Sequence, residues 1–381
     1  MSNISNKLKN CKGVYLDYAA TTPLTPQVED YIVSLLDVYQ NPSSMYQSGV
    51  EAKKIITTAR NNVVKFINAN PENIIFTSGG SASNTLFIKG YTQKNECKVL
   101  YSPTSHKSVL KCVESLKYKC PLKVDYTGKI DIQDLKECLS MDTMKKLVVI
   151  EYANSEIGTI QDVKQIIEIC HFYNAVVYVD CTGSISQIPI DVKILDVDGL
   201  GFSAHKLGAL KGTGVLYKKP FIELEPLIYG SQEQGLFGGT ENVIGIAALS
   251  KAVEDYNYFS ITSENRDYVH NYIINNIVDS HIIGADVDSR LPHNLYVCFD
   301  GIEGESLMIL LDMANIQVST GSACASGDLM PSSTLVAIGL DEKLIHSGIR
   351  MTFSGYETKD EMDYLCSNLQ RCVGILRQLN K

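Results

Sequence analysis

The stretch Gly201-Phe202-Ser203-Ala204-His205-Lys206-Leu207-Gly208 lies between two short apolar runs, at residues 194–200 and 214–217. The two runs predict neighbouring strands of a buried sheet. A lysine between such strands is unusual, because burying an ammonium group costs free energy and lowers its pKa. A lowered pKa suits Schiff-base chemistry, since only the neutral amine attacks a carbonyl. Lys206 is therefore a candidate catalytic residue, and Ser203 and His205 beside it offer donors for a phosphate.

Outward from this stretch, strand-like and helical patterns alternate. Strands are predicted at residues 73–77, 98–101, 122–125, 146–152 and 175–180, with helices at about 82–93, 105–118, 131–140 and 162–173. Short strands separated by helices of about 10 to 15 residues are typical of βαβ units. The runs at 147–150 and 175–179 lack polar alternation, which favours burial on both faces. The pattern predicts an α/β domain with a mostly parallel sheet.

The character of the sequence changes after about residue 243. A long helical stretch at 244–277 is followed by a Gly/Ser-rich loop at 319–333 and a closing helix at 359–378. Strand-like runs are fewer here, which favours a smaller α+β domain. A chain of 381 residues is also long for one simple core. We expect a large domain at 13–252, with 1–12 and 253–381 forming the small domain.

Composition excludes several classes of function. The formal net charge of −9 argues against a nucleic-acid-binding surface, which needs a basic face. No apolar stretch reaches the roughly 18 residues of a membrane helix, and residues 1–12 show no secretory signal. The eleven cysteines lack C-x-x-C spacing, so neither a zinc site nor a disulfide framework is indicated. We expect mostly reduced, buried cysteines in a cytoplasmic protein without a metal.

Polar residues collect at the predicted carboxyl ends of strands, where ligands bind in open parallel sheets. The turn with Gly80 and Ser81 opens a helix whose free N–H groups suit an anion, although many such turns are merely Gly-rich. His106 and Asp180 each stand where a helix is predicted to begin, so either could simply cap that helix. The carboxylate of Asp180 could instead pair with the protonated ring nitrogen of a bound cofactor. The residues expected to share one site are Ser81, His106, Asn154, Asp180, Ser203, His205 and Lys206.

Two residues of the C-terminal part are further candidates. Cys324 lies in Ser319-Thr320-Gly321-Ser322-Ala323-Cys324-Ala325-Ser326-Gly327, where small neighbours leave a thiol free to reach a site as a nucleophile. Arg350 follows a polar loop and suits a carboxylate ligand. The alternative interpretations, an idle loop cysteine and an ordinary exposed arginine, stay open on these grounds.

The motifs taken in order resemble the cysteine desulfurases of the NifS/IscS type, which are pyridoxal-phosphate enzymes of aminotransferase class V. The resemblance runs from Leu16-Asp17-Tyr18-Ala19-Ala20-Thr21-Thr22-Pro23 to the C-terminus. Its other motifs are Asn41-Pro42-Ser43-Ser44, Thr104-Ser105-His106-Lys107, Asn154-Ser155-Glu156-Ile157-Gly158, Val179-Asp180, Phe202-Ser203-Ala204-His205-Lys206, Gly239-Thr240-Glu241-Asn242, Glu303-Gly304-Glu305-Ser306, Gly321-Ser322-Ala323-Cys324 and Ile349-Arg350.

The resemblance implies a fold, a cofactor and its binding residues. The fold would be the aspartate-aminotransferase-like fold type I, with a seven-stranded, mostly parallel sheet in the large domain. Lys206 would bind pyridoxal 5′-phosphate covalently, with His106 stacked on its ring and Asp180 paired with the ring nitrogen. The remaining cofactor contacts would come from Gly80, Ser81, Asn154, Ser203, His205 and, across a homodimer, Thr240.

The resemblance also implies a reaction. Asn154 and Arg350 would bind the carboxylate of L-cysteine, and Cys324 would take its sulfur as a persulfide and release L-alanine. Lys206, Cys324 and His106 would be the catalytic residues. The sulfur would pass to an acceptor protein, such as an iron–sulfur scaffold, or into a thiolation pathway.

The chain departs from the family pattern at several positions that bear on ring electronics, substrate preference and rate. Gly183 stands where the family has a glutamine, Ala82 where it has an acid, and Phe237 where it has an arginine. Two other functions therefore remain open beside the desulfurase. One is a pyridoxal-phosphate lyase or aminotransferase acting on another amino acid, and the other is a low-activity paralogue that serves as a sulfur-relay partner.

Overall fold

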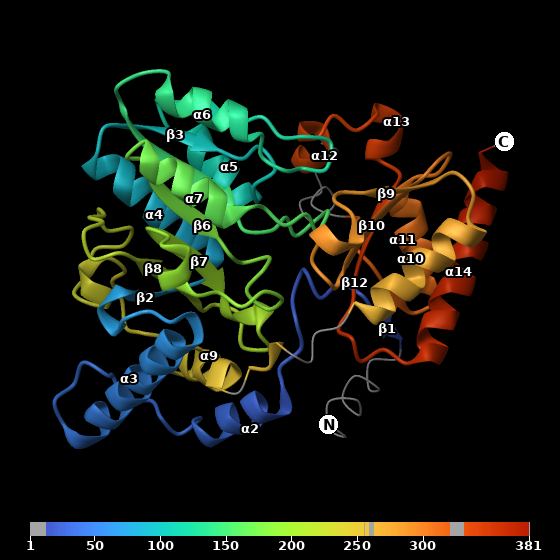
Figure 1. Cartoon of the computed structure of the whole chain (residues 1–381). Coiled ribbons are helices and arrows are strands. Elements are labelled where there is room, and N and C mark those ends of the chain that lie inside the picture. Colours follow the sequence, from blue (N-terminus) through green and yellow to red (C-terminus); the bar gives the residue numbers. More distant parts are fainter. Residues whose placement is uncertain (1–12, 255, 259–262, 321–330, 381) are drawn as a thin grey trace.

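A computed structural model describes residues 13–254, 256–258, 263–320 and 331–380. Its larger part carries a seven-stranded sheet with helices on both faces, and the smaller, C-terminal part stands beside it (Figure 1). Cys324 and residues 1–12 lie outside the described residues. No helix among the described residues is long and apolar enough to cross a membrane.

The large sheet confirms the predicted α/β class. Its strand order is β2-β8-β7-β6-β5-β3-β4, and β8 runs antiparallel to both neighbours while the other pairs are parallel. The strands are β2 (Ile74–Thr77), β3 (Cys97–Tyr101), β4 (Lys119–Pro121), β5 (Lys145–Glu151), β6 (Val176–Asp180), β7 (Gly199–Ser203) and β8 (Gly214–Lys218).

One predicted strand was misplaced, since β4 ends at Pro121 and residues 122–125 lead into a turn. The Asp125 carboxylate accepts the backbone N–H groups of Thr127 and Lys129, at 2.8 and 2.9 Å, and so closes that turn locally. Such side-chain bonds to the backbone compete with strand pairing. The apolar residues at 122–125 predicted a strand because their pattern does not show this turn.

The two faces of the sheet bury different cores. Along β5, Val148 and Ile150 belong to one apolar cluster, whereas Leu147 and Val149 belong to another. Because successive strand residues point to opposite faces, a continuous apolar run is what a doubly covered strand requires. One face carries α3 (Gln47–Ile67), α6 (Ile132–Ser140), α7 (Val163–Phe172) and α9 (Val243–Glu254), and the other carries α4 (Gly80–Lys94) and α5 (Lys107–Glu114).

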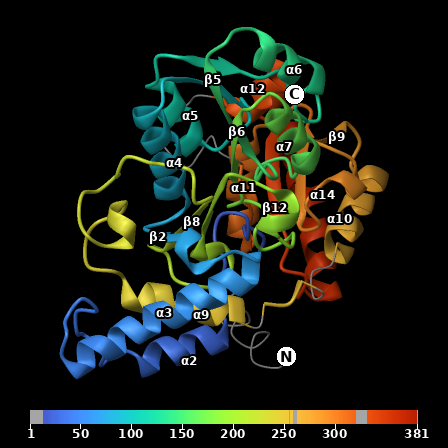
Figure 2. The ribbon, with the colours of Figure 1, turned by 60° about the vertical axis from the view of Figure 1, so that its left-hand side comes forward.

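Helix α3 buries one face, whose residues recur at intervals of three and four along the sequence. In α3 the buried positions are Gly49, Ala52, Ile56, Ala59, Val63 and Ile67, a single stripe that packs against α9 (Figure 2). The helix ends where Asn68 adopts a left-handed conformation, with φ of 54°. The short helices α2 (Pro26–Ser34) and α8 (Val192–Leu195) also belong to this part.

The smaller part is built on an antiparallel sheet of order β12-β10-β9. Its elements are β9 (Ser280–Ile283), β10 (Asn294–Phe299), β11 (Ile316–Gln317), β12 (Gly348–Thr352), α10 (Glu264–Asn276), α11 (Gly304–Met313), α12 (Ser333–Ala337), α13 (Glu342–Ile345) and α14 (Lys359–Leu379). The closing helix α14, predicted at 359–378, begins with a capping box between Thr358 and Glu361.

The predicted helical stretch at 244–277 was wrong, because it consists of two helices, α9 and α10. Between them Tyr256 and Tyr258 turn inward and pack on the ring of Phe66. Their hydroxyls donate to backbone oxygens of Ser186 and Ile185 at 2.8 and 2.7 Å. Packing these two rings on Phe66 stabilises a chain path that turns away from the axis of α9, so the helix does not continue.

The N-terminal strand β1 (Val14–Tyr15) joins the smaller part, where it pairs in parallel with β11. Val14 and Leu16 lie in the apolar core of that part, together with residues of β10, β12 and α14. Val14 and Leu16 therefore contribute to the core of the smaller part, although they follow residue 13 in the sequence. The predicted domain boundary at residue 13 stays a prediction.

Candidate active site

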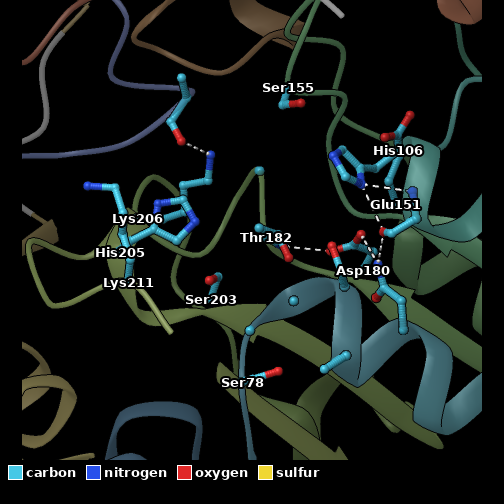
Figure 3. Close-up of a pocket in the computed structure, with 18 of the residues that line it drawn as sticks. Ser78, His106, Glu151, Ser155, Asp180, Thr182, Ser203, His205, Lys206 and Lys211 are labelled. Atoms are coloured by element: carbon cyan, nitrogen blue, oxygen red, sulfur yellow. Dashed lines mark hydrogen bonds between the residues drawn. The ribbon is translucent and has the colours of Figure 1, made fainter. Parts of the chain in front are cut away.

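A cavity with a volume of about 420 Å³ lies at the carboxyl ends of β5, β6 and β7 (Figure 3). Parallel strands place their carboxyl ends at one edge, so side chains from distant stretches meet there. The predicted residues that line the cavity are Gly80, Ser81, His106, Asp180, Ser203, His205 and Lys206. Asn154, Thr240 and Arg350 are not among the lining residues.

Lys206 ends a single 3₁₀ turn, Ala204–Lys206, that follows β7. Its ammonium group donates to the backbone oxygens of Ala19 and Ala20, the latter at 2.8 Å. Burial and the nearby charge of Arg350 lower the pKa of the lysine to about 8, against the opposing effect of Asp17 and Asp180. The neutral amine is thus accessible near neutral pH, as the opening stretch of sequence predicts.

The lowered pKa of Lys206 predicts how uptake of pyridoxal phosphate depends on pH. The neutral amine is the reactive form. The rate at which pyridoxal phosphate attaches to cofactor-free protein should therefore rise about tenfold per pH unit below pH 8 and level off above pH 8. The measurement is the rate of change in cofactor absorbance after mixing, between pH 6 and 10. A rate that keeps rising to pH 10 would show that the amine titrates as an ordinary exposed lysine.

Asp180 is held at the cavity by both carboxylate oxygens. The Asn84 amide donates to Oδ2 at 2.7 Å and the backbone N–H of Thr182 donates to Oδ1 at 2.9 Å. Asn84 is fixed in turn by the hydroxyl of Tyr178, which donates to its Oδ1 at 2.7 Å. The side chain is nearly buried yet lines the cavity, so it is a fixed acceptor for a positively charged group.

His106 combines both roles that the sequence left open. It caps α5, where its Nδ1 accepts the backbone N–H of Ser108 at 3.1 Å, and its ring also lines the cavity. The ring is exposed to the cavity, but the protein packed around it desolvates the imidazolium and lowers the pKa. Because Nδ1 is an acceptor here, the neutral ring carries its proton on Nε2.

The start of α4 is suited to a phosphate. Gly79 occupies the N-cap with no side-chain cap bond, so N–H groups of the first turn remain for a ligand beside Ser81 and Ser203. A Cβ on Gly80 would lie 2.5 Å from Thr182 Oγ1, so the close approach requires glycine. Thr182 Oγ1 is buried and has no hydrogen-bond partner among the described residues. This orphaned hydroxyl fits a site built for a bound group.

Arg350 lies in β12 of the smaller part and is linked to the cavity through Ser155. Its Nη2 donates to Asp17 Oδ1 at 2.6 Å, and its Nη1 donates to the backbone oxygen of Ser155 at 3.1 Å. Ser155 itself lines the cavity (Figure 3). The arginine is nearly buried, which differs from an ordinary surface arginine, and its role in binding a carboxylate stays a prediction.

Asn154 is occupied by bonds within the protein. Its Nδ2 donates to Thr104 O and to Glu151 Oε1, each at 2.9 Å, and its Oδ1 accepts the N–H groups of Glu156 and Ile157. The side chain thereby closes the turn that follows β5. Its direct contact with cofactor or substrate stays a prediction.

The structure does not show two other predicted residues, Thr240 and Cys324, at the cavity. Thr240 is exposed and is not among the residues that line the cavity. Cys324 is outside the described residues, but the chain on either side of it is anchored. Ser319 pairs with Arg350 through the backbone, and Ser332 Oγ donates to Glu156 Oε2 at 2.8 Å. The described residues on the two sides of Cys324 are therefore tied to Arg350 and to Glu156.

The cysteines behave as the sequence predicts where they are described. Eight of the nine described cysteines are buried, and Cys120 is half-buried. Burial raises the pKa of all eight buried thiols, which are Cys97, Cys112, Cys138, Cys170, Cys181, Cys298, Cys366 and Cys372. A raised pKa keeps them protonated and poorly nucleophilic at neutral pH.

Sequence reasoning missed Glu151. This glutamate ends β5, is nearly buried and lines the cavity beside Asp180, its register partner on β6. Burial raises the pKa of its carboxyl to about 8, helped by the charges of Asp180 and Glu156 and opposed by bonds from Asn154 and Thr104. The available signal was an acid directly after the continuous apolar run 147–150.

Comparison with known proteins gives one consistent result. The aminotransferase class-V model matches residues 14–365. The cysteine desulfurase IscS of Dictyoglomus turgidum is 39% identical over 384 residues, covering 97% of this chain and 96% of the relative, and that of Clostridium botulinum is 35% identical over 390 residues, covering 97% and 96%. The solved structure of a NifS-like protein superimposes with a TM-score of 0.88 at 30% identity, covering 95% of this chain and all of that one.

Proposed function

The chain belongs to the class-V aminotransferase family and, within it, to the cysteine desulfurases of the NifS/IscS type, and we propose that it converts L-cysteine to L-alanine with Cys324 as the sulfur-accepting nucleophile. Pyridoxal 5′-phosphate is the cofactor of this family. The observation that best supports the assignment in this chain is that Lys206 and the anchored carboxylate of Asp180 line one cavity, in which burial lowers the pKa of the lysine.

The residues around the cavity fit the cofactor. Lys206 would hold it covalently, and the amides at the start of α4, with Ser81, Ser203 and His205, would hold its phosphate. Asp180 would pair with the ring nitrogen, because it lines the cavity and hydrogen bonds to both of its carboxylate oxygens hold it in place. When bound, the cofactor supplies an electron sink for the bonds at the substrate Cα.

Lys206 also provides a base. An amine with a pKa of about 8 accepts a proton from Cα at neutral pH and returns one to the product carbon, provided that it lies within hydrogen-bonding reach. His106, neutral and protonated on Nε2, lines the same cavity and would cover the ring. Arg350, fixed by Asp17 and Ser155, would bind the substrate carboxylate together with Asn154.

The sulfur step balances without an external oxidant. The Cβ–S bond of L-cysteine breaks, an S–S bond forms to the Cys324 thiolate, and the carbon gains a proton to give L-alanine. The product on the protein is a persulfide. The contacts of the described residues Ser319 with Arg350 and Ser332 with Glu156 support this role for Cys324.

The homodimer and the acceptor belong to the same proposal. Thr240 is exposed and does not line its own cavity, which supports a contact with the cofactor phosphate of a partner subunit. Its loop carries exposed apolar side chains, among them Tyr229 at 81% exposure. A sulfur-acceptor protein, such as an iron–sulfur scaffold, and a cytoplasmic location complete the proposal.

The assignment is tested by mixing the purified, cofactor-loaded protein with L-cysteine. We expect the cofactor absorbance to change and L-alanine to appear in equal amount with sulfane sulfur, which a thiol reductant releases as sulfide. Alanine formation depends on sulfur leaving Cβ, so the two products must match. A bound cofactor that ignores L-cysteine but responds to another amino acid would favour the lyase or aminotransferase alternative. A spectrum that responds to no amino acid would favour the relay alternative.

A further inference from the structure

The carboxyl of Glu151 has no role in the proposed reaction, although it lines the same cavity. Its Oε1 accepts two hydrogen bonds, from Thr104 Oγ1 at 2.8 Å and from Asn154 Nδ2 at 2.9 Å. The side chain is 5% exposed, so these bonds lie in a poorly solvated place where they hold geometry firmly.

A chain of contacts leads from Glu151 to Arg350. Glu151 fixes the amide of Asn154, and the Oδ1 of that amide accepts the N–H groups of the next turn. Within this turn the backbone oxygen of Ser155 accepts Arg350 Nη1 at 3.1 Å. Each link is a directional hydrogen bond, and the links at Glu151 and Asn154 are buried, so the position of the first group constrains the last.

The charge of Glu151 matters for a site that binds anions. The titratable groups near it are Asp180 on β6, Glu156 on the following turn and His106 at the start of α5, with Lys206 across the cavity. Two of these are carboxylates, so a further negative charge is unfavourable. An uncharged carboxylic acid still accepts the bonds from Thr104 and Asn154, but adds no repulsion toward a substrate carboxylate or a phosphate.

We propose that Glu151 is a positioning residue, uncharged in the working enzyme, that orients Asn154 and through the next turn Arg350, and so sets the affinity for the substrate carboxylate. The proposal rests on the role of Arg350 in the proposed function. It assigns to Glu151 no contact with the reacting atoms.

Three variants separate positioning from charge. Glu151→Gln keeps an acceptor for both bonds and cannot ionise, whereas Glu151→Ala removes the acceptor. The matched control is Glu114→Gln, which changes a glutamate whose side chain is 60% exposed. Each full-length, cofactor-loaded protein is assayed for kcat and KM with L-cysteine between pH 6.5 and 9.5.

The expected pattern differs for each variant. Relative to Glu151→Gln, the wild-type KM should rise on the order of tenfold between pH 7.5 and 9.5, as a carboxylate forms beside Asp180. Because L-cysteine itself titrates in this range, the ratio between the two proteins is the informative quantity. Glu151→Ala should raise KM about tenfold at every pH while kcat changes less, since a bond partner is lost. Glu114→Gln should follow the wild type.

A spectroscopic reading makes the result independent of turnover. The bound cofactor should show a step in absorbance near pH 8 in the wild type and in Glu114→Gln, and no such step in Glu151→Gln. If no protein forms sulfide from L-cysteine, the proposed function fails while the spectral step still decides whether Glu151 titrates. Identical pH profiles for wild type and Glu151→Gln, or a wild-type KM in Glu151→Ala, would overturn the proposal.

Discussion

Replacing Lys206 with alanine should abolish covalent capture of pyridoxal phosphate and lower alanine production by at least about 10²–10⁴-fold, the usual contribution of a positioned acid–base group. The lysine supplies both the attachment point and the base, so both are lost together. The measurement combines the rate of alanine formation with mass spectrometry after borohydride reduction, which fixes the cofactor to the lysine that holds it.

The matched control for this change is Lys211→Ala, because Lys211 lines the same cavity and carries the same charge (Figure 3). It should retain a reduced cofactor adduct on Lys206, whatever its effect on affinity. If the wild-type protein carries the reduced adduct on Lys211, the assignment of Lys206 as the attachment point is contradicted.

Replacing Cys324 with alanine should leave the cofactor bound and abolish persulfide on the protein, with sulfide production falling by a factor of about 10² or more. The substrate still binds, but no thiolate attacks its sulfur. Persulfide is measured by alkylation and mass spectrometry after one turnover, and alanine is quantified in parallel.

Cys120→Ala is the control for Cys324, since Cys120 is the described cysteine that is not buried. Its removal should change neither persulfide nor alanine. The eight buried cysteines are poor competitors because burial raises the pKa of each thiol, to about 11 for Cys97 and Cys112. Undiminished sulfide from Cys324→Ala would contradict the assignment of this residue.

The sequence predicts the site best where its residues lie at strand ends. Asp180, Ser203 and Lys206 each follow an apolar run, and a parallel sheet brings such positions to one edge whatever their separation. The same logic would have found Glu151, which follows the run 147–150. It was passed over because the predicted strand continued to residue 152 and concealed a rim position.

Other features depend on contacts that no local pattern reveals. Arg350 sits in a strand and is fixed by Asp17, which is 333 residues away along the chain. The break between α9 and α10 follows from two tyrosines that pack on Phe66, a residue of α3. Helical spacing continues through such a break, so periodicity predicts one helix where packing makes two.

The N-terminal segment has a consequence for the order of events during synthesis. Val14 and Leu16 find their apolar partners in the C-terminal core, Asp17 pairs with Arg350, and Ala20 accepts the bond from Lys206. At about 5–20 residues per second, a ribosome needs roughly 15 to 70 seconds to travel from Asp17 to Arg350. Throughout that interval Asp17 lacks its partner, whereas Lys206, the partner of Ala20, is made partway through it. The contact between Asp17 and Arg350 is therefore among the last to form, and a nascent chain cannot make it before β12 has emerged.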